Sequence, residues 1–175
     1  MHSGGGLPVR KYEESMSKLR EKTNVMRLLD AVNATYQSHK YLASGAVSGM
    51  AVAATLHQDP AHVFKTLVTR GTSGRYYVFM VPVCQELDLK KAAECVGEKK
   101  IDMIKSKELL PLTGYVHGGC SPIGMKKAFP LIIDQSAEAR DNIMFSAGKI
   151  GYQVEMRLAQ PPKPVAFSLA AIVAG

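Results

Sequence analysis

The sequence is poor in cysteine, and the cysteines it has are not spaced for a disulfide framework or a zinc site. There are three in 175 residues, Cys84, Cys95 and Cys120, and no two form a Cys-x-x-Cys pair. Small disulfide-bonded domains use an even number of cysteines, and structural zinc sites use closely spaced pairs. The pattern argues against both and is typical of a protein from a reducing cytosol.

The sequence also lacks a hydrophobic run long enough to cross a membrane. Its apolar tail, residues 165–175, is far shorter than the roughly 20 residues that a helical span needs. We therefore expect the tail to pack on the domain as a strand or a short helix. The N-terminus lacks the apolar centre of a secretion signal. We interpret residues 1–10 as a flexible leader or a cloning remnant and expect no association with a membrane.

Two common catalytic glycine motifs are absent from the glycine-rich segment 113–124. The phosphate-binding loop of nucleotide-binding proteins needs a lysine directly after its second glycine, and Met125 stands there instead. The nucleophile elbow of hydrolases needs a glycine two residues after its serine, but Ser121 is followed by Pro122 and Ile123. The segment matches neither motif, and its four glycines predict a loop whose backbone a ligand can approach closely.

Acidic residues are outnumbered by basic ones, 15 against 22, which gives a formal net charge of +7. Clustered Lys and Arg side chains bind polyanions by releasing counterions from phosphates. The same charge can also be spread over a solvated face, so on charge alone both interpretations stay open. The contents of hydrophobic residues, 46%, and charged residues, 21%, are those of an ordinary globular protein. We expect one domain over residues 11–175.

Hydrophobic periodicity and turn residues predict a mixed α/β domain. The predicted helices cover 25–33 after a cap at Thr23 and Asn24, 49–56 after Ser48, and 89–96 after Asp88 with a stop at Gly97. Strands are predicted over 36–41, 63–69, 75–83, 100–104, 130–134, 142–147 and 152–158. The second and third of these strands are expected to form a hairpin around the turn 71–74.

Four sequence elements follow one another between residues 23 and 158. They are Val-Phe-Lys-Thr-Leu at 63–67, Leu-Asp-Leu-Lys-Lys-Ala-Ala at 87–93, Thr-Gly-Tyr and Gly-Gly-Cys-Ser-Pro-Ile-Gly within 113–124, and Ser-Ala-Gly-Lys-Ile-Gly at 146–151. Together they resemble the YbaK/EbsC family of free-standing aminoacyl-tRNA editing proteins, which is related to the editing domain inserted in bacterial prolyl-tRNA synthetases.

The resemblance implies both a fold and a function. The family fold is a mixed, barrel-like β-sheet flanked by helices. The implied activity is hydrolysis of mischarged aminoacyl-tRNA in the cytosol, with cysteine on the proline transfer RNA, Cys-tRNA(Pro), as the expected substrate and no metal or cofactor. The implied partners are the acceptor end of the transfer RNA and, in a transient complex, prolyl-tRNA synthetase. The oligomeric state is left open.

The resemblance also assigns a site. Lys65 matches the functional lysine of the family and is expected to contact the terminal ribose-phosphate or to polarise the acyl carbonyl, although a strand lysine more often faces solvent. The other expected substrate-binding residues are Tyr41, Phe64, Thr66, Gly118, Gly119, Cys120, Ser121, Pro122, Ser146, Gly148 and Lys149. Amides of the glycine loop would hold the aminoacyl group, and Lys149 would reach a phosphate.

No Ser-His-Asp or Cys-His arrangement is evident, and family members are thought to use the thiol of the substrate cysteine to attack its own ester. The sequence offers no histidine that can be paired with Cys120. A cysteine in such a position is more often a small buried packing residue than a nucleophile. Ser121 could orient substrate or water, but a serine in such a turn commonly bonds its own backbone. His39 matches the family's first strand and is equally compatible with a structural histidine. The remaining histidines near the motifs have no metal-ligand spacing: His57, His62 and His117.

The sequence departs from the family pattern at two places. Ala147 and Ile150 stand where relatives often have glycine and arginine, and the segment 42–48 lacks a phenylalanine that some relatives place in the pocket. A cavity that differs by one methylene discriminates between substrates by only about 1–3 kcal/mol. A deacylase for Ala-tRNA(Pro) therefore stays open, as does a non-catalytic module that binds a nucleotide or an RNA end.

Overall fold

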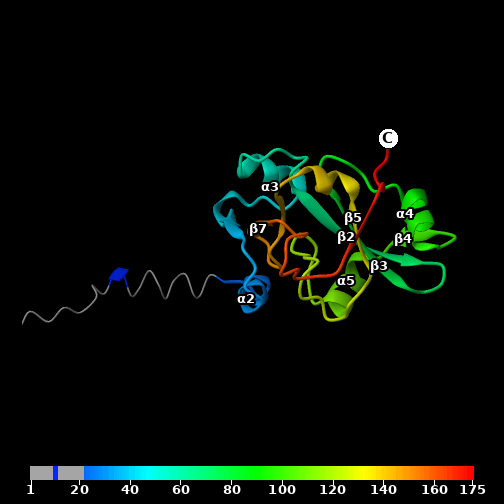
Figure 1. Cartoon of the computed structure of the whole chain (residues 1–175), viewed down its shortest axis with the longest axis horizontal. Coiled ribbons are helices and arrows are strands. Elements are labelled where there is room, and N and C mark those ends of the chain that lie inside the picture. The colour runs from blue at the N-terminus through cyan, green and yellow to red at the C-terminus, as the bar shows by residue number, and fades with distance from the viewer. Residues whose placement is uncertain (1–9, 12–21) are drawn as a thin grey trace, which may run out of the picture.

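The structure is a computed structural model in which residues 10–11 and 22–175 are described. Its strands form two sheets with helices around them (Figure 1). The smaller sheet is antiparallel, in the order β1-β7-β6, and consists of β1 (Gln37–Lys40), β6 (Ile143–Ser146) and β7 (Tyr152–Met156). Residues 1–9, which are nearly all of the predicted leader, lie outside the described part of the chain.

The larger sheet is mixed, with the strand order β4-β2-β3-β5-β8. Its members are β2 (Phe64–Gly71), β3 (Tyr76–Pro82), β4 (Ile101–Met103), β5 (Leu131–Asp134) and β8 (Ser168–Ala170). The predicted hairpin is confirmed by the antiparallel pairing of β2 with β3, in which Phe64 lies opposite Pro82. The apolar tail forms the strand β8, which pairs in parallel with β5, so the first of its two predicted states is confirmed.

The prediction of a barrel-like sheet is wrong for the part of the chain that the structure describes. The two sheets meet at an isolated bridge between Val63 and Met144, where the Met144 amide donates to the His62 carbonyl over 3.0 Å. Strand β2 gives one edge to β3 and the far end of its other edge to β4. Each strand has only two edges, so only the start of the second edge of β2 is free to contact β6. The two sheets therefore do not join into a closed barrel.

The predicted helices are confirmed as α2 (Asn24–Ala31), α3 (Gly49–Thr55) and α4 (Leu89–Val96). Each begins after the predicted cap, whose side-chain oxygen accepts from amides of the first turn: Thr23 from Met26 over 3.3 Å, Ser48 from Ala51 over 3.2 Å, and Asp88 from Lys90 and Lys91 over 3.0 Å. These bonds satisfy amides that have no partner within the helix. None of the described helices is long and apolar enough to cross a membrane.

One helix, α5 (Ser106–Thr113), is absent from the prediction, and Pro111 lies inside it. A proline within a helix removes one backbone hydrogen bond. The helix forms because its start is held by Glu108, whose carboxylate accepts from the Lys105 amide over 2.8 Å. Two short 3-10 helices, η1 (Leu42–Ser44) and η2 (Gln135–Ala139), are also missing from the prediction.

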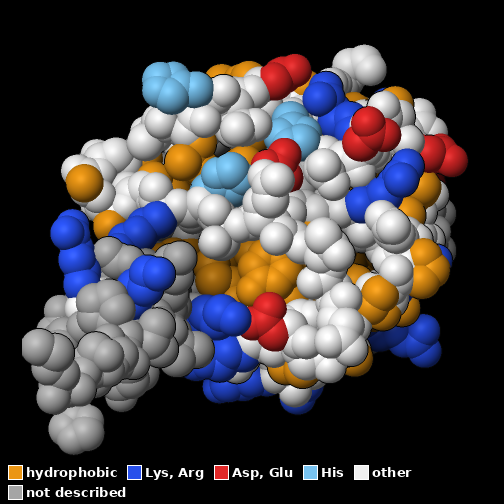
Figure 2. Space-filling view, turned by 60° about the vertical axis from the view of Figure 1, so that its left-hand side comes forward, with side chains coloured by type: hydrophobic (Ala, Val, Ile, Leu, Met, Phe, Trp, Pro, Cys, Tyr) orange, Lys and Arg blue, Asp and Glu red, His pale blue; other side chains and the backbone are white. Residues whose placement is uncertain are grey.

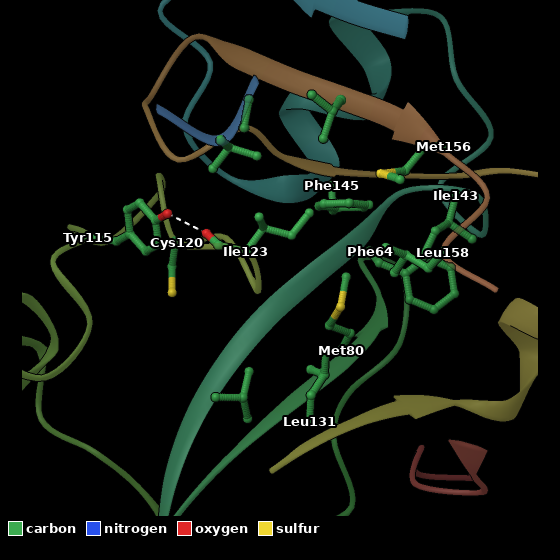
Figure 3. Close-up of a cluster of buried hydrophobic side chains, with 14 of the residues drawn as sticks. Phe64, Met80, Tyr115, Cys120, Ile123, Leu131, Ile143, Phe145, Met156 and Leu158 are labelled. Atoms are coloured by element: carbon green, nitrogen blue, oxygen red, sulfur yellow. Dashed lines mark hydrogen bonds between the residues drawn. The ribbon is translucent and has the colours of Figure 1, made fainter. Parts of the chain in front are cut away.

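The main hydrophobic core lies between the two sheets and behind the glycine-rich segment (Figure 3). Phe64 and Met80 enter it from the larger sheet and Phe145 from the smaller one, and all three are at most 2% exposed. Tyr115, from the glycine-rich segment, donates its hydroxyl to the Ile123 carbonyl. Full burial of one such side chain contributes about 1.5–3 kcal/mol, so the core holds the loop and both sheets in a fixed arrangement.

Candidate active site

A cavity of about 280 Å³ opens between β2, β7 and the glycine-rich segment. Half of the predicted site residues line it: Phe64, Lys65, Thr66, Gly118, Cys120 and Ser146. The other half do not: Tyr41, Gly119, Ser121, Pro122, Gly148 and Lys149. The structure therefore brings together the Phe-Lys-Thr element of β2, part of the glycine loop and the end of β6, which lie far apart in the sequence.

Lys65 supplies the positive charge of the cavity. Its side chain is 26% exposed, and its Nζ lies 3.3 Å from Oε1 of Glu86, whose own side chain is 82% exposed. An ion pair with such an exposed carboxylate is weak, at about 0–1 kcal/mol. The ammonium group can therefore leave Glu86 for a bound acyl oxygen or phosphate at little cost.

Two polar atoms in the cavity wall have no hydrogen-bond partner among the residues that the structure describes. They are Oγ1 of Thr66 on β2 and Oε1 of Gln153 on β7, both of them inaccessible to solvent. Gln153 as a residue is only 6% exposed. Because an unpaired buried polar atom costs about 1–3 kcal/mol, such atoms are rare in folded proteins. Their convergence on one cavity beside a lysine is the strongest indication of a ligand site.

The buried hydroxyl of Tyr41 also has no partner among the described residues, although Tyr41 does not line the cavity. It follows β1, and its amide donates to the Gly151 carbonyl over 2.9 Å. Side chains alternate between the two faces of a strand, and paired residues share a face. Since His39 pairs with Gln153, Tyr41 continues the face of the smaller sheet on which Gln153 lies.

The glycines of the loop are needed to bring its backbone against the turn that joins β6 and β7. Gly118 has a φ of +86°, and a Cβ atom there would lie 2.9 Å from Cγ1 of Val47. A Cβ on Gly119 would lie 3.1 Å from the amide nitrogen of Ile150. Gly118 borders the cavity, whereas Gly119 serves this close contact between two loops.

Ser121 and Pro122 lie away from the cavity. Ser121 is fully buried, and its Oγ accepts from the Ile123 amide over 3.4 Å, which is the local backbone bond typical of serine in a turn. Pro122 lines a different cavity together with Phe129 and Leu131. Both residues shape the loop, and neither is placed to touch a ligand beside Lys65.

The turn after β6 contributes to the cavity through Ser146 alone. Gly148 has a φ of +88°, and a Cβ there would lie 2.8 Å from Val25 and 2.9 Å from Tyr115, so this glycine is required by packing. Ser146 Oγ accepts from the Gly148 amide over 3.2 Å. Lys149 points to the other side of the turn, where its Nζ lies 5.7 Å from the centre of the Tyr152 ring.

Cys120 borders the cavity as a neutral thiol. Burial raises its pKa to about 12, and the residue is 9% exposed. Burial, and to a lesser extent the charge of an ionised Cys120, also raise the pKa of Tyr115 to about 12. A thiolate is the reactive form of cysteine, and among the described residues no hydrogen bond joins Cys120 to a histidine. Cys120 is therefore a packing residue at neutral pH.

Beside the cavity, on the same face of the smaller sheet, one carboxylate binds two histidines. Glu155 accepts from His39 Nε2 at 3.1 Å and from His62 Nε2 at 2.8 Å. Burial alone would raise the pKa of Glu155, but the hydrogen bonds from His62 and His39 outweigh it, and the pKa is lowered. The cluster ties β1, β7 and the segment before β2 together, so His39 has the structural role that the sequence left open.

Gln153 and His117 line the cavity but are missing from the predicted site. His117 is a neighbour of the predicted loop residues, so its position in the sequence could have included it. Gln153 alternates with Tyr152 and Val154 along β7, and an alternating polar residue normally indicates the solvent side of a strand. No local pattern distinguishes Gln153 as a site residue, because its side of β7 faces a cavity that only the folded chain builds, from β2, α3 and the glycine-rich segment.

Taken together, the fold and the cavity define an α+β protein with a small polar site between two sheets. A family model described as the aminoacyl-tRNA editing domain matches residues 44–161, a range that includes every residue of the cavity wall. The chain belongs to the aminoacyl-tRNA editing domain family.

Individual relatives agree with this assignment. The chain is 42% identical over 140 residues to the Enterococcus faecalis protein EbsC, named as a candidate Cys-tRNA(Pro)/Cys-tRNA(Cys) deacylase, with 79% of this chain and 85% of that protein covered. It is 28% identical over 98 residues to the proline–tRNA ligase of Pelobacter propionicus, covering 56% of this chain and 17% of the ligase. A crystal structure of a candidate trans-editing enzyme for prolyl-tRNA synthetase matches the fold with a TM-score of 0.72 at 19% identity, covering 87% of this chain and 99% of that one.

Proposed function

We propose that this protein hydrolyses the ester of mischarged aminoacyl-tRNA, with Cys-tRNA(Pro) as its principal substrate. The observation that carries the proposal is the pair of unpartnered buried oxygens, Thr66 Oγ1 and Gln153 Oε1, in the wall of the cavity that Lys65 also lines. An aminoacyl ester brings the missing partners, namely an ammonium group that donates and a carbonyl that accepts. Membership of the editing-domain family and the name of the Enterococcus relative support the same reaction.

The size of the cavity favours a small amino acid. Its volume of about 280 Å³ lies just below the range of about 300–1,000 Å³ that is usual for ligand sites. It can enclose an aminoacyl group, while the nucleic acid that bears this group must remain outside. Its wall combines the aliphatic side chains of Val52, Val63 and Val83 with the polar groups of Lys65, Thr66 and Gln153, a combination that suits a short side chain next to an ester.

Each polar group has a distinct role in the proposed complex. Gln153 Oε1 accepts a hydrogen bond from the α-ammonium group, and Thr66 Oγ1 hydrogen-bonds the ester. The Lys65 ammonium group leaves Glu86 and stabilises the negative charge that develops on the carbonyl oxygen in the transition state, where a positioned cation contributes most. Lys65 is therefore the catalytic residue of the proposal.

The nucleophile in this proposal comes from the substrate, because Cys120 is held as a neutral thiol. The sulfur of the substrate cysteine attacks its own carbonyl carbon, and the thiol proton passes to the departing ribose oxygen. The carbon–oxygen ester bond breaks, which releases the transfer RNA with a free hydroxyl and the amino acid as a cyclic thioester. Water then opens the thioester to give cysteine.

Prolyl-tRNA synthetase is the proposed source of the substrate. The likeness to a segment of a proline–tRNA ligase and the name of the structural neighbour support a functional link with that enzyme. A transient complex would deliver Cys-tRNA(Pro) directly after its synthesis.

The test measures deacylation of the proline transfer RNA charged in turn with cysteine, serine, alanine and proline. Serine differs from cysteine only in having oxygen in place of sulfur, so it separates thiol chemistry from selection by size. Wild-type protein is compared with Lys65→Ala and with Lys99→Ala, which removes an exposed lysine from the loop after α4. We expect rapid loss of cysteine alone and a fall in kcat/KM of about 10²- to 10³-fold for Lys65→Ala, with Lys99→Ala equal to wild type.

Each other outcome overturns a defined part of the proposal. Equal hydrolysis of cysteine and serine would remove the substrate thiol from the mechanism. A preference for alanine would replace the substrate. No hydrolysis of any ester, together with RNA binding that survives Lys65→Ala, would indicate a binding module in place of an enzyme.

A further inference from the structure

The mouth of the active-site cavity is marked by the wall residues that solvent reaches. Of the residues that line the cavity, Val47, Ser48 and His117 are exposed, and all the others are buried or half-buried. An aminoacyl group that reaches Lys65 and Gln153 therefore enters past these three residues. The ribose and the base that carry the aminoacyl group lie at this mouth, because the cavity has room for the aminoacyl group alone.

An exposed apolar shelf, formed by Leu42, Val47 and Ile150, begins at this mouth. All three are exposed hydrophobic side chains. A Cβ atom placed on Gly118 would lie 2.9 Å from Cγ1 of Val47 and 3.5 Å from Cγ1 of Ile150, so these two side chains flank one glycine of the cavity wall. The side chain of Leu42 covers Gly151, the residue after Ile150. The shelf is therefore continuous with the cavity.

His117 adds an aromatic ring to the same mouth. It directly precedes Gly118 in the glycine-rich segment and is exposed. None of the residues that the structure describes forms a hydrogen bond or an ion pair with its side chain. His39 and His62 differ in this respect, because both bind the carboxylate of Glu155. The ring of His117 is therefore available to a ligand at the cavity mouth.

The shelf lies between the starts of α3 and β7, on the left in Figure 1, and this side comes forward in Figure 2. Apolar side chains are exposed on this side between polar and charged ones (Figure 2). Single exposed apolar side chains are common, but a continuous apolar surface indicates an interaction site. Its position next to the cavity indicates the occupant, because an ester in the cavity and the nucleoside outside it belong to one molecule.

We propose that the shelf and His117 bind the terminal adenine base of the transfer RNA. The inference rests on the proposed function, because the ester in the cavity joins the amino acid to the terminal adenosine. The base stacks with the His117 ring and packs on Val47 and Ile150, while the ribose lies over the mouth. Unpaired bases are commonly bound by stacking on aromatic side chains, histidine among them. This contact holds the ester in place beside Lys65.

The test compares two small substrates that share the ester and the ribose but differ in the base. One is 3′-O-cysteinyl-adenosine, and the other is the 3-O-cysteine ester of methyl ribofuranoside, in which a methoxy group replaces the base. The variants are His117→Ala, His117→Phe and Ile150→Ser. Met103→Ser is the matched control for Ile150→Ser, because Met103 is also an exposed hydrophobic residue and lies on β4, at the other side of the molecule from α3 and β7 (Figure 1).

We expect the kcat/KM of wild-type protein to be at least about fivefold higher on the adenosine ester than on the methyl riboside ester. His117→Ala should lower kcat/KM on the adenosine ester at least about fivefold, and Ile150→Ser about two- to fivefold, with a much smaller change on the methyl riboside ester. His117→Phe should keep the preference for the adenosine ester, because phenylalanine retains a ring that can stack. Met103→Ser should equal the wild type on both substrates.

The failures of the two proposals are distinguishable. If wild-type protein cleaves neither small ester and also leaves Cys-tRNA(Pro) intact, the proposed function is wrong and the inference falls with it. If wild type cleaves both small esters equally, or if the variants lose as much activity on the methyl riboside ester as on the adenosine ester, the function stands and the base site is overturned. Cleavage of Cys-tRNA(Pro) without cleavage of the adenosine ester would also overturn the base site, because binding would then depend on RNA beyond the terminal nucleoside.

Two further outcomes test the parts of the base site. If His117→Phe loses as much activity as His117→Ala, the ring does not act by stacking and the assignment of His117 is overturned. If the variants differ from wild type only when prolyl-tRNA synthetase is added, the shelf binds the synthetase and the base site is again overturned.

Discussion

The strand wall of the active-site cavity and the inner side of the glycine-rich segment differ in whether their buried polar groups have hydrogen-bond partners. In the wall, Thr66 Oγ1 and Gln153 Oε1 are buried and have no partner in the described part of the chain. In the segment, the Thr113 hydroxyl donates to the Leu109 carbonyl over 2.7 Å, and the Tyr115 hydroxyl donates to Ile123. The loop polar groups already stabilise the fold, whereas the groups of the wall are left for a ligand.

This difference separates stability from function within one site. Removing a satisfied buried group should cost stability, while removing an unpartnered group should cost activity and leave stability equal or higher. Substitutions on the two sides should therefore differ in kind, and their expected effects decrease from Gln153 to Cys120.

Among the substitutions that test this comparison, Gln153→Leu should have the largest effect, because it replaces the side chain that carries an unpartnered oxygen by an apolar group of similar size. A hydrogen bond to a charged group contributes about 1.5–3 kcal/mol, so kcat/KM on Cys-tRNA(Pro) should fall about 10- to 100-fold. The melting temperature should stay the same or rise. Gln85→Leu, at an exposed position, is the matched control. A loss of stability without loss of activity would mean that Gln153 is structural.

Glu155→Gln should lower stability near neutral pH by about 1–3 kcal/mol, because the carboxylate accepts from two histidines. The folded pKa of Glu155 is lowered from 4.5, so its contribution is present above the unfolded pKa and is lost as pH falls through the folded pKa. Urea unfolding should therefore show a difference between wild type and variant at pH 7 that shrinks in acid. Glu94→Gln on the exposed side of α4 should show no difference at either pH.

Thr66→Val and Thr69→Val form a matched pair on β2. Thr69 is fully buried, and its hydroxyl donates to the Tyr77 carbonyl over 2.9 Å, so its replacement should cost about 1 kcal/mol of stability and leave activity unaffected below the melting temperature. Thr66→Val should lower kcat/KM about fivefold, which corresponds to about 1 kcal/mol, and leave stability intact. The reverse assignment of effects would contradict the comparison.

The smallest effect is expected at Cys120, where a neutral buried thiol should resist alkylation. Cys84 and Cys95 are exposed, and burial raises the pKa of Cys95, so iodoacetamide should modify Cys84 first and Cys95 more slowly. Cys120 should react only after unfolding. Mass spectrometry of peptides from the native, alkylated protein measures this directly, and rapid modification of Cys120 would restore it as a candidate nucleophile.

The fold could be predicted from the sequence wherever a local signal decided the outcome. Helix caps at Thr23, Ser48 and Asp88, and the β-branched and aromatic residues of β2 and β3 on either side of a turn, are local signals, and the structure confirms the elements that they predict. Helix α5, which has Pro111 inside it, is absent from the prediction. The barrel prediction was wrong because closure depends on which edges of β2 are already paired, which is a property of the assembled sheets.

The site was predictable in part for a similar reason. The motif residues Lys65 and Gly118 do border the cavity, but Ser121 and Gly148 belong to the packing beneath it. The same sequence motif contains residues that line the cavity and residues that pack beneath it, so the sequence alone could not distinguish the two. Gln153 was missed because its side of β7 becomes a cavity wall only when β2, α3 and the glycine-rich segment fold against it.

The central claim is that the unpartnered oxygens beside Lys65 receive the aminoacyl group. Its most direct test is a crystal structure with the amide-linked analogue of 3′-cysteinyl-adenosine, which cannot be hydrolysed as an ester. The account predicts the α-amino nitrogen within hydrogen-bond distance of Gln153 Oε1 and the acyl oxygen next to Lys65 Nζ. An analogue bound outside this cavity, or one that leaves Gln153 Oε1 without a partner, would contradict it.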